Sequence, residues 1–116
     1  MIIKLPYPPK ELMPNCKNGK HWSATAKVKD KAGFDAYYIT LEALQTQKPA
    51  YSGLIPLTIT FVQSDKRLRD LDNLLASSKA SIDGIAKALK VDDYIFEPIT
   101  IMRGYDKDKS YMRVVL

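Results

Sequence analysis

The chain has 116 residues, and this length predicts a single domain over residues 1–116. With 46% hydrophobic and 27% charged residues, the composition is typical of a globular protein and excludes a disordered or fibrous chain. No apolar run is long enough to span a membrane. The single cysteine and the lack of a signal-peptide pattern predict a reducing cytoplasm, which excludes a disulfide-rich secreted protein.

The formal charge of +5 is unevenly distributed along the chain. Residues 1–69 carry eleven basic and five acidic side chains, residues 70–97 carry three and six, and residues 98–116 carry four and two. An acidic segment therefore lies between basic flanks. The basic excess suggests a polyanionic partner, although charged side chains often do no more than solvate a surface.

The first half of the chain predicts a strand, a helix and a second strand. Residues 1–5 form a short apolar run that prolines end, as expected of a strand leading into a loop. Residues 23–47 have apolar side chains at helical spacing, with Gly33 as a predicted weak point. Residues 54–63 alternate between two faces, and Pro56 indicates either the start of a strand or an edge strand.

A second helix is predicted after a charged stretch, because helical spacing of apolar side chains returns over residues 73–90. Asp72 or Asn73 is suited to cap its first turn by accepting from unpaired backbone N–H groups. Gly84 is the predicted weak point of this helix, since glycine lowers helix stability.

Two final apolar segments, 99–105 and 110–116, flank a polar turn and predict a closing β-hairpin. The element order is therefore β-α-β-α-β-β. Helical connections favour parallel strand pairs, whereas a hairpin is antiparallel. We expect an α+β (mixed α/β) domain with two main helices and a mixed sheet.

Acidic side chains cluster at both ends of the second predicted helix. Asp70 and Asp72 precede it at a spacing that puts both on one side of an extended segment, and Asp92 and Asp93 follow it. Clustered carboxylates repel one another unless a cation neutralises them. Because all these ligands are oxygens, Mg²⁺ is the expected metal and Mn²⁺ its substitute.

The sequence around these carboxylates resembles the RusA family of Holliday-junction resolvases. The similarity lies in the motif Arg69-Asp70-Leu71-Asp72-Asn73, a following helix with Lys79 and Asp83, the Asp92-Asp93 pair, and an N-terminal strand ending in Leu5-Pro6-Tyr7-Pro8-Pro9. These features extend over most of the chain.

The resemblance implies a RusA-like fold and a homodimeric, Mg²⁺-dependent endonuclease that cuts four-way DNA junctions symmetrically in recombination and repair. It implies Asp70, Asp72 and Asp93 as the catalytic, metal-binding carboxylates and Asp92 as a supporting ligand. Such enzymes are commonly carried by phages and prophages, which implies action in the cytoplasm of a bacterial host. The chain has no glycine-rich phosphate loop, so no nucleotide cofactor is expected.

One position departs from the family pattern. The family places a functional lysine three residues after the asparagine of the motif, where this chain has Ala76. Lys79 lies three residues further on, and at about 100° per residue it would project from a similar face one turn later. Lys79 is therefore expected to be either a catalytic residue or a simple phosphate contact.

Basic side chains near the acidic motif are candidates for DNA binding. Contacts from Lys and Arg to phosphates position DNA without reading its sequence. The candidates are Lys66, Arg67 and Arg69 before the motif, and Lys17, Lys20 and His21 in the N-terminal loop. Ordinary loop packing is an equally good interpretation of His21.

Helix geometry limits how the carboxylates can meet. A straight helix over residues 73–90 would be about 25 Å long at 1.5 Å per residue, which puts Asp93 far from Asp72 of the same chain. Either the helix breaks near Gly84 and folds back, or two subunits pair so that Asp93 of one chain meets Asp70 and Asp72 of its partner. The second arrangement requires a twofold dimer.

Two other classes of function are compatible with the sequence. A non-catalytic DNA- or RNA-binding module would explain the basic excess, but its unneutralised carboxylates would repel phosphate. A metal-dependent enzyme acting on nucleotides or nucleotide sugars could use Asp70 and Asp72 as cation ligands. The short chain and the lack of a phosphate loop argue against that last reading.

Overall fold

The computed structural model describes residues 1–14 and 22–116. Its elements are β1 (Ile2–Pro6), the 3₁₀ helix η1 (Lys10–Leu12), α1 (Trp22–Gln47), β2 (Ile55–Gln63), α2 (Leu71–Ser77), α3 (Lys79–Leu89), the 3₁₀ helix η3 (Asp93–Ile95), β3 (Phe96–Tyr105) and β4 (Tyr111–Val115). The predicted element order and the α+β class are confirmed, with the second predicted helix divided into α2 and α3.

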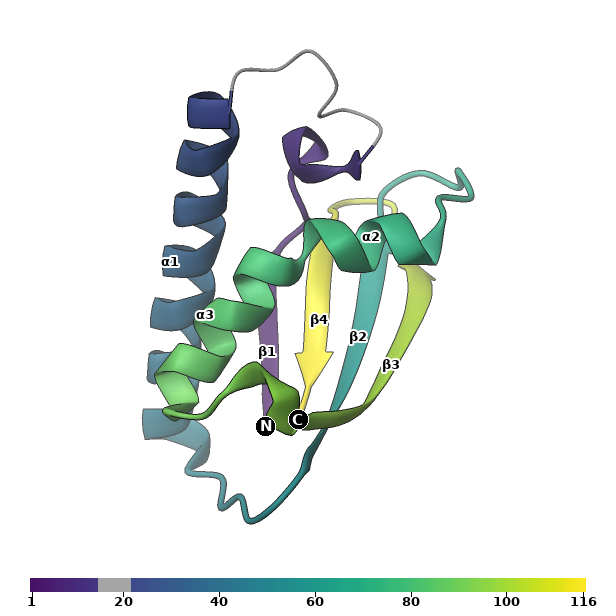
Figure 1. The fold of residues 1–116 in the computed structure, drawn as a ribbon. Coiled ribbons are helices and arrows are strands. Elements are labelled where there is room, and N and C mark those ends of the chain that lie inside the picture. Colours follow the sequence, from purple (N-terminus) through teal and green to yellow (C-terminus); the bar gives the residue numbers. More distant parts are fainter. Residues whose placement is uncertain (15–21) are drawn as a thin grey trace.

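The four strands form one mixed sheet in the order β1-β4-β2-β3, as Figure 1 shows. β2 and β3 are parallel, and β4 is antiparallel to both β1 and β2. The mixed sheet is confirmed, but the predicted closing hairpin is wrong, because β2 lies between β3 and β4. β4 pairs with β1 on one side and with β2 on the other, so neither of its edges is left for β3.

The helices pack on one face of this sheet, where α2 and α3 cross the strands and α1 contacts both α3 and β1 (Figure 1). The predicted alternation of β2 is confirmed, since Ile55, Leu57, Ile59 and Phe61 are all buried. They share the core with the residues Ile3, Leu5, Leu74, Ile85, Met112 and Val114. Within the described ranges, no helix is both long and apolar enough to cross a membrane.

Pro56 lies near the start of β2, as expected, but β2 is a central strand and the predicted edge position is wrong. The register between β2 and β3 shifts between Ile55 and Leu57. This irregularity is where a residue without a backbone N–H can be accommodated in a central strand.

The predicted single helix over residues 73–90 is wrong at both its start and its middle. It begins at Leu71, so the N-cap is Asp70. It is interrupted at Ser78, which ends α2 and precedes α3. The hydroxyls of Ser77 and Ser78 each donate to the backbone carbonyl three residues earlier, both at 2.7 Å, and such bonds compete with helical backbone pairing.

The two helical glycines, the predicted weak points, lie at a close crossing of α1 and α3, and both helices are continuous through them. A Cβ added to Gly84 would lie 2.4 Å from the Gly33 carbonyl oxygen and 3.1 Å from the Ala36 Cβ. The side chain is absent at Gly84 because the backbone of α1 occupies its space.

This crossing predicts opposite effects of alanine at its two glycines. Gly84→Ala is expected to destabilise the fold by about 1–3 kcal/mol, because α1 and α3 must move apart. In Gly33→Ala the added Cβ meets only the Ala80 carbonyl oxygen at an ordinary 3.5 Å, so helix propensity should raise stability by up to about 1 kcal/mol. Urea unfolding measures both; equal effects of the two substitutions would contradict the close crossing.

Candidate active site

The first two predicted catalytic carboxylates lie where the loop after β2 enters α2. Asp70 has an extended backbone as the N-cap residue, and Asp72 lies in the first turn; both side chains are exposed. Only Asp70 is extended, so the strand-like spacing that was expected to put both on one side does not apply. The helix starts too early for that geometry.

An ion pair organises the loop that precedes these carboxylates. Asp65 accepts from both terminal nitrogens of Arg69, at 2.9 and 3.2 Å, and from the backbone N–H of Arg67 at 3.1 Å. The Arg69 hydrogen bonds, followed by the Arg67 bond, lower the pKa of Asp65. The same pairing raises the pKa of Arg69, so its positive charge is already compensated within the loop.

Side chains from two strands hold the carbonyls of the same loop. The Gln63 amide donates to the Arg67 carbonyl at 2.8 Å, and its oxygen accepts from the Tyr7 hydroxyl at 3.0 Å. Arg103 of β3 donates from Nε to the Arg69 carbonyl at 2.9 Å. Gln63 is only 4% exposed, so this attachment is anchored in the core. The residue just before Asp70 is therefore fixed from β3.

A cleft of 530 Å³ borders Asp70, and its lining brings together the N-terminal loop and the basic loop. Its polar lining residues are Tyr7, Lys10, Arg67, Arg69, Asp70 and Asn73. Burial raises the pKa of the Tyr7 hydroxyl, which stays a neutral hydrogen-bonding group near pH 7. Lys10 and Tyr7 were not singled out as site residues from the sequence, because their approach depends on how the chain folds back.

The remaining basic candidates lie elsewhere. Lys66 does not line this cleft; its Nζ lies 5.3 Å from the centre of the Tyr105 ring, a cation–π contact. Lys17, Lys20 and His21 lie outside the described residues. The structure thus places two of the six predicted DNA-binding residues, Arg67 and Arg69, on the cleft beside Asp70.

Asp93 belongs to a separate charged cluster at the start of α3. The Lys79 ammonium contacts Asp83 at 2.6 Å and also contacts Asp93. The Asp83 bond and then the Asp93 bond raise the pKa of Lys79, and the bond from Lys79 lowers the pKa of Asp93. Asp92 is exposed at the N-cap of η3. Lys79 and Asp93 therefore meet, and Asp83 joins them.

The predicted metal ligands are not gathered into one group within the described part of a single chain. Residues 1–14 and 22–116 contain no cluster of three or more acidic, His or Cys side chains that could hold a metal ion. The break near Gly84, one of the two arrangements considered, does not occur, because α3 is continuous over Lys79–Leu89. The chain after α3 nevertheless returns along it, so Asp93 contacts Lys79 at the start of α3 and does not lie beyond its far end as expected. As donors, the exposed carboxylates of Asp70, Asp72 and Asp93 suit a hard cation such as Mg²⁺.

The Lys79–Asp93 pair predicts a pH-dependent stability. A carboxylate whose pKa lies below its ordinary 3.8 stabilises the fold above that value, and the contribution is lost as the pH falls through the lowered pKa. The raised pKa of Lys79 means that its contribution is lost only above its ordinary 10.5. Asp93→Asn should therefore lower the urea midpoint slightly at pH 7 and leave it unchanged near about pH 2.

Asp108→Asn is the matched control for this measurement, because Asp108 is exposed and makes no ion pair within the described ranges. Its midpoint should equal that of the wild type at both pH values. A loss in Asp93→Asn that persists unchanged at the lower pH would contradict the ion-pair account.

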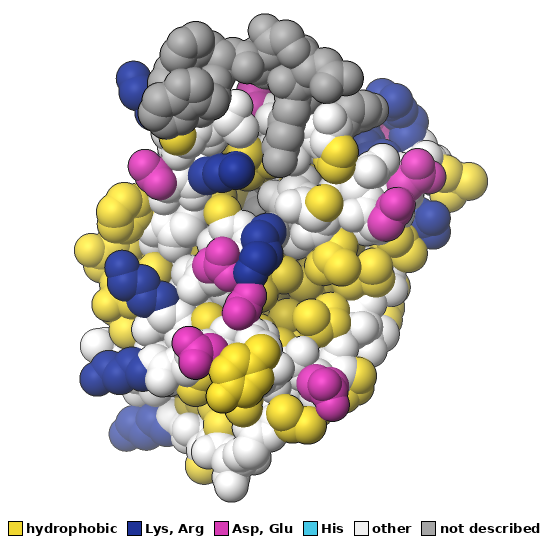
Figure 2. Space-filling model, viewed as in Figure 1, with side chains coloured by type: hydrophobic (Ala, Val, Ile, Leu, Met, Phe, Trp, Pro, Cys, Tyr) yellow, Lys and Arg dark blue, Asp and Glu magenta, His cyan; other side chains and the backbone are white. Residues whose placement is uncertain are grey.

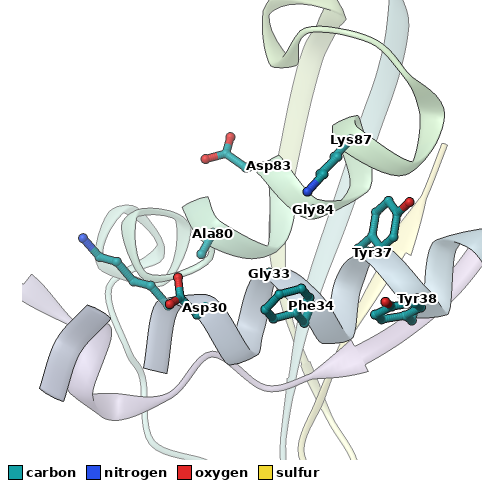
Figure 3. A pocket seen from close by; sticks show the side chains of 10 residues that line it. Asp30, Gly33, Phe34, Tyr37, Tyr38, Ala80, Asp83, Gly84 and Lys87 are labelled. Atoms are coloured by element: carbon teal, nitrogen blue, oxygen red, sulfur yellow. The ribbon is translucent and has the colours of Figure 1, made fainter. Parts of the chain in front are cut away.

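A second hollow, of 590 Å³, lies along the junction of α1 and α3 and is lined by residues of both helices (Figure 3). Phe34 and Tyr38 of α1 are 59% and 61% exposed beside it, and Figure 2 shows hydrophobic side chains along the outer edge of α1. Lys87 of α3 lies over the Tyr37 ring, 5.4 Å from its centre. None of the predicted catalytic carboxylates lines this hollow, and its exposed aromatic rings suit a protein contact better than catalysis.

Comparison with known proteins finds similarity to a protein without a described function. No family model matches the chain. It is 35% identical over 95 residues to an uncharacterized protein of Xylella fastidiosa (strain Temecula1). The aligned part covers 81% of this chain and 61% of that protein, so the chain spans less than two thirds of its relative.

Proposed function

We propose that the protein is a RusA-like, Mg²⁺-dependent endonuclease that cuts four-way DNA junctions by paired nicks. The observation that supports this best is the cleft beside Asp70, which joins an exposed carboxylate to the cationic side chains of Lys10 and Arg67. A phosphodiester requires both features, since cations hold its phosphates and carboxylates hold the metal. The motif Asp70-Leu71-Asp72-Asn73 adds the family resemblance.

The protein groups have separate tasks in this proposal. Asp70, Asp72 and Asp93 would hold Mg²⁺ through carboxylate oxygens. A bound Mg²⁺ supplies activation of water and stabilisation of charge on the phosphate. Lys10 and Arg67 hold the DNA backbone along the cleft, and the Asp65–Arg69 pair together with Gln63 keeps the loop before Asp70 in one conformation.

The proposed enzyme acts as a homodimer in which Asp93 of one chain faces Asp70 and Asp72 of the other. Two observations support this arrangement. The three carboxylates are not gathered within the described part of one chain. The exposed Phe34 and Tyr38 on α1 offer an apolar surface of the kind that a second copy could cover. Two sites related by a twofold axis would cut a symmetric junction in pairs.

Incubation with end-labelled four-way junctions and with linear duplex of the same sequence tests the proposal. We expect paired, symmetric nicks in the junction that require Mg²⁺ or Mn²⁺, and little cutting of the duplex. Binding without cleavage in either metal would favour a non-catalytic DNA-binding module. Hydrolysis confined to free nucleotides or nucleotide sugars would favour the third class.

A further inference from the structure

Two arginines contact or form the backbone that leads into Asp70. They differ in whether a carboxylate neutralises their charge. Arg69 is bound through both terminal nitrogens to Asp65, and its side chain is 29% exposed. Arg103 is exposed and uses only its Nε, which donates to the Arg69 carbonyl. Within the described ranges Arg103 makes no ion pair with a carboxylate.

The position of Arg103 on the sheet directs it toward the candidate site. In β3 it is paired with Phe61 of β2, a buried residue on the face that the helices cover. Its bond to the carbonyl of Arg69, the residue just before Asp70, then holds it beside the candidate site. An arginine fixed at Nε keeps two terminal N–H₂ groups, which are the part of the guanidinium that binds phosphate oxygens.

We infer that Arg103, in place of the expected Arg69, binds a DNA phosphate beside Asp70 and also positions the Asp70 backbone. This inference rests on the proposed function of the same site. Arg69 would have to give up two charge-assisted bonds to Asp65 before it could bind phosphate, and it would leave a carboxylate facing the DNA. Arg103 loses nothing on binding, because its bond to the loop involves a different nitrogen.

The two tasks can be separated by substitution, with junction binding measured in the Asp72→Asn background so that no cutting occurs. Arg103→Gln keeps an N–H donor for the Arg69 carbonyl and loses the charge. Binding should weaken about tenfold at 0.1 M salt, and the slope of log affinity against log salt should fall by about one for each engaged protomer. Arg103→Lys keeps the charge and should keep that slope.

Cleavage, measured without the Asp72→Asn substitution, should show the opposite order, with Arg103→Lys impaired more than Arg103→Gln. Arg103→Lys cannot hold the carbonyl and a phosphate with separate nitrogens, so the rate at saturating enzyme should fall about tenfold, a magnitude typical of groups that support a metal ligand. Arg103→Gln keeps a donor for the Arg69 carbonyl, so its rate at saturating enzyme should fall less than that of Arg103→Lys. Arg113→Gln is the matched control, because Arg113 of β4 pairs with Thr60 and lies on the opposite face of the sheet. Arg113→Gln should change neither the salt slope of junction binding nor the cleavage rate.

A labelling experiment on the wild-type protein covers the case in which an Arg103 variant fails to fold. Phenylglyoxal modifies accessible arginines, and bound junction should protect Arg103 but leave Arg113 reactive. Equal labelling of Arg103 with and without junction, or an unchanged salt slope in Arg103→Gln, would overturn the inference while leaving the proposed nuclease intact. If the wild-type protein binds no branched DNA, the proposed function fails and this inference fails with it.

Discussion

Asp72→Asn is expected to abolish junction cleavage and to leave junction binding intact or slightly stronger. The substitution conserves shape and hydrogen-bonding capacity but removes the charge that holds a divalent cation. Cleavage should fall by more than about 100-fold, which exceeds the 10–100-fold loss typical of residues that only support a metal ligand. Binding should not weaken, because an exposed carboxylate beside the basic cleft repels phosphate in the absence of metal.

Single-turnover cleavage and a gel-shift assay on the same labelled junction measure the two quantities separately. Asp108→Asn, the same chemical change in the loop between β3 and β4, should leave both unchanged. Parallel losses of binding and cleavage in Asp72→Asn would instead indicate a disturbed α2, which circular dichroism would show. Full cleavage by the variant would remove Asp72 from the proposed metal site.

The fold was predictable wherever one face of a helix or strand is buried, because apolar residues then recur at a regular spacing along the sequence. The alternation over Ile55, Leu57, Ile59 and Phe61 identified β2, and helical spacing identified α1 within one residue of its start. Strand order was not predictable in the same way. Whether β4 pairs with β3 or lies between β1 and β2 depends on how all four strands pair together. The residue pattern within a single strand does not determine this.

The division between α2 and α3 was missed because its cause is local and polar. Ser77 and Ser78 occupy positions compatible with helical spacing, and only their hydroxyl bonds to Leu74 and Leu75 show the interruption. Gly84 looked like the weaker position from propensity alone. In the fold that glycine is needed for the approach of α1, so tertiary packing outweighs its propensity.

The candidate site was predictable as a motif but not as an arrangement. Asp70, Arg67 and Arg69 could be found by their spacing, and they lie on one cleft. The Asp65–Arg69 pair was within reach of sequence reasoning, since the two residues are four apart. The contacts of Tyr7 and Arg103 were not, because Tyr7 bonds to Gln63 of β2 across 56 residues and Arg103 bonds to the loop at Arg69 across 34 residues.

Mixing two inactive variants is expected to restore cleavage if each metal site is shared between chains. In a mixed dimer of Asp72→Asn and Asp93→Asn, one site combines both substitutions, while the other combines Asp72 of one chain with Asp93 of the other and is complete. Half of randomly assorted dimers are mixed, so about one quarter of the wild-type number of sites should be active. Each such dimer should nick one strand only and should not make paired cuts.

A mixture of Asp70→Asn with Asp72→Asn is the matched control, because both residues belong to the same half of the shared site. In that mixed dimer each site keeps one substituted ligand, so cleavage should not return. Co-refolding the chains ensures exchange, and differently tagged subunits show that mixed dimers have formed.

The same experiment decides how Asp93 completes the site. If the three carboxylates met within one chain, every site in the Asp72→Asn and Asp93→Asn mixture would carry a substitution, and no cleavage would return. The Lys79 contact bears on this outcome, because the Lys79 ammonium competes with a metal ion for the Asp93 carboxylate in either arrangement. Mixed dimers without cleavage, or a protein that sediments as a monomer with junction bound, would refute the shared site.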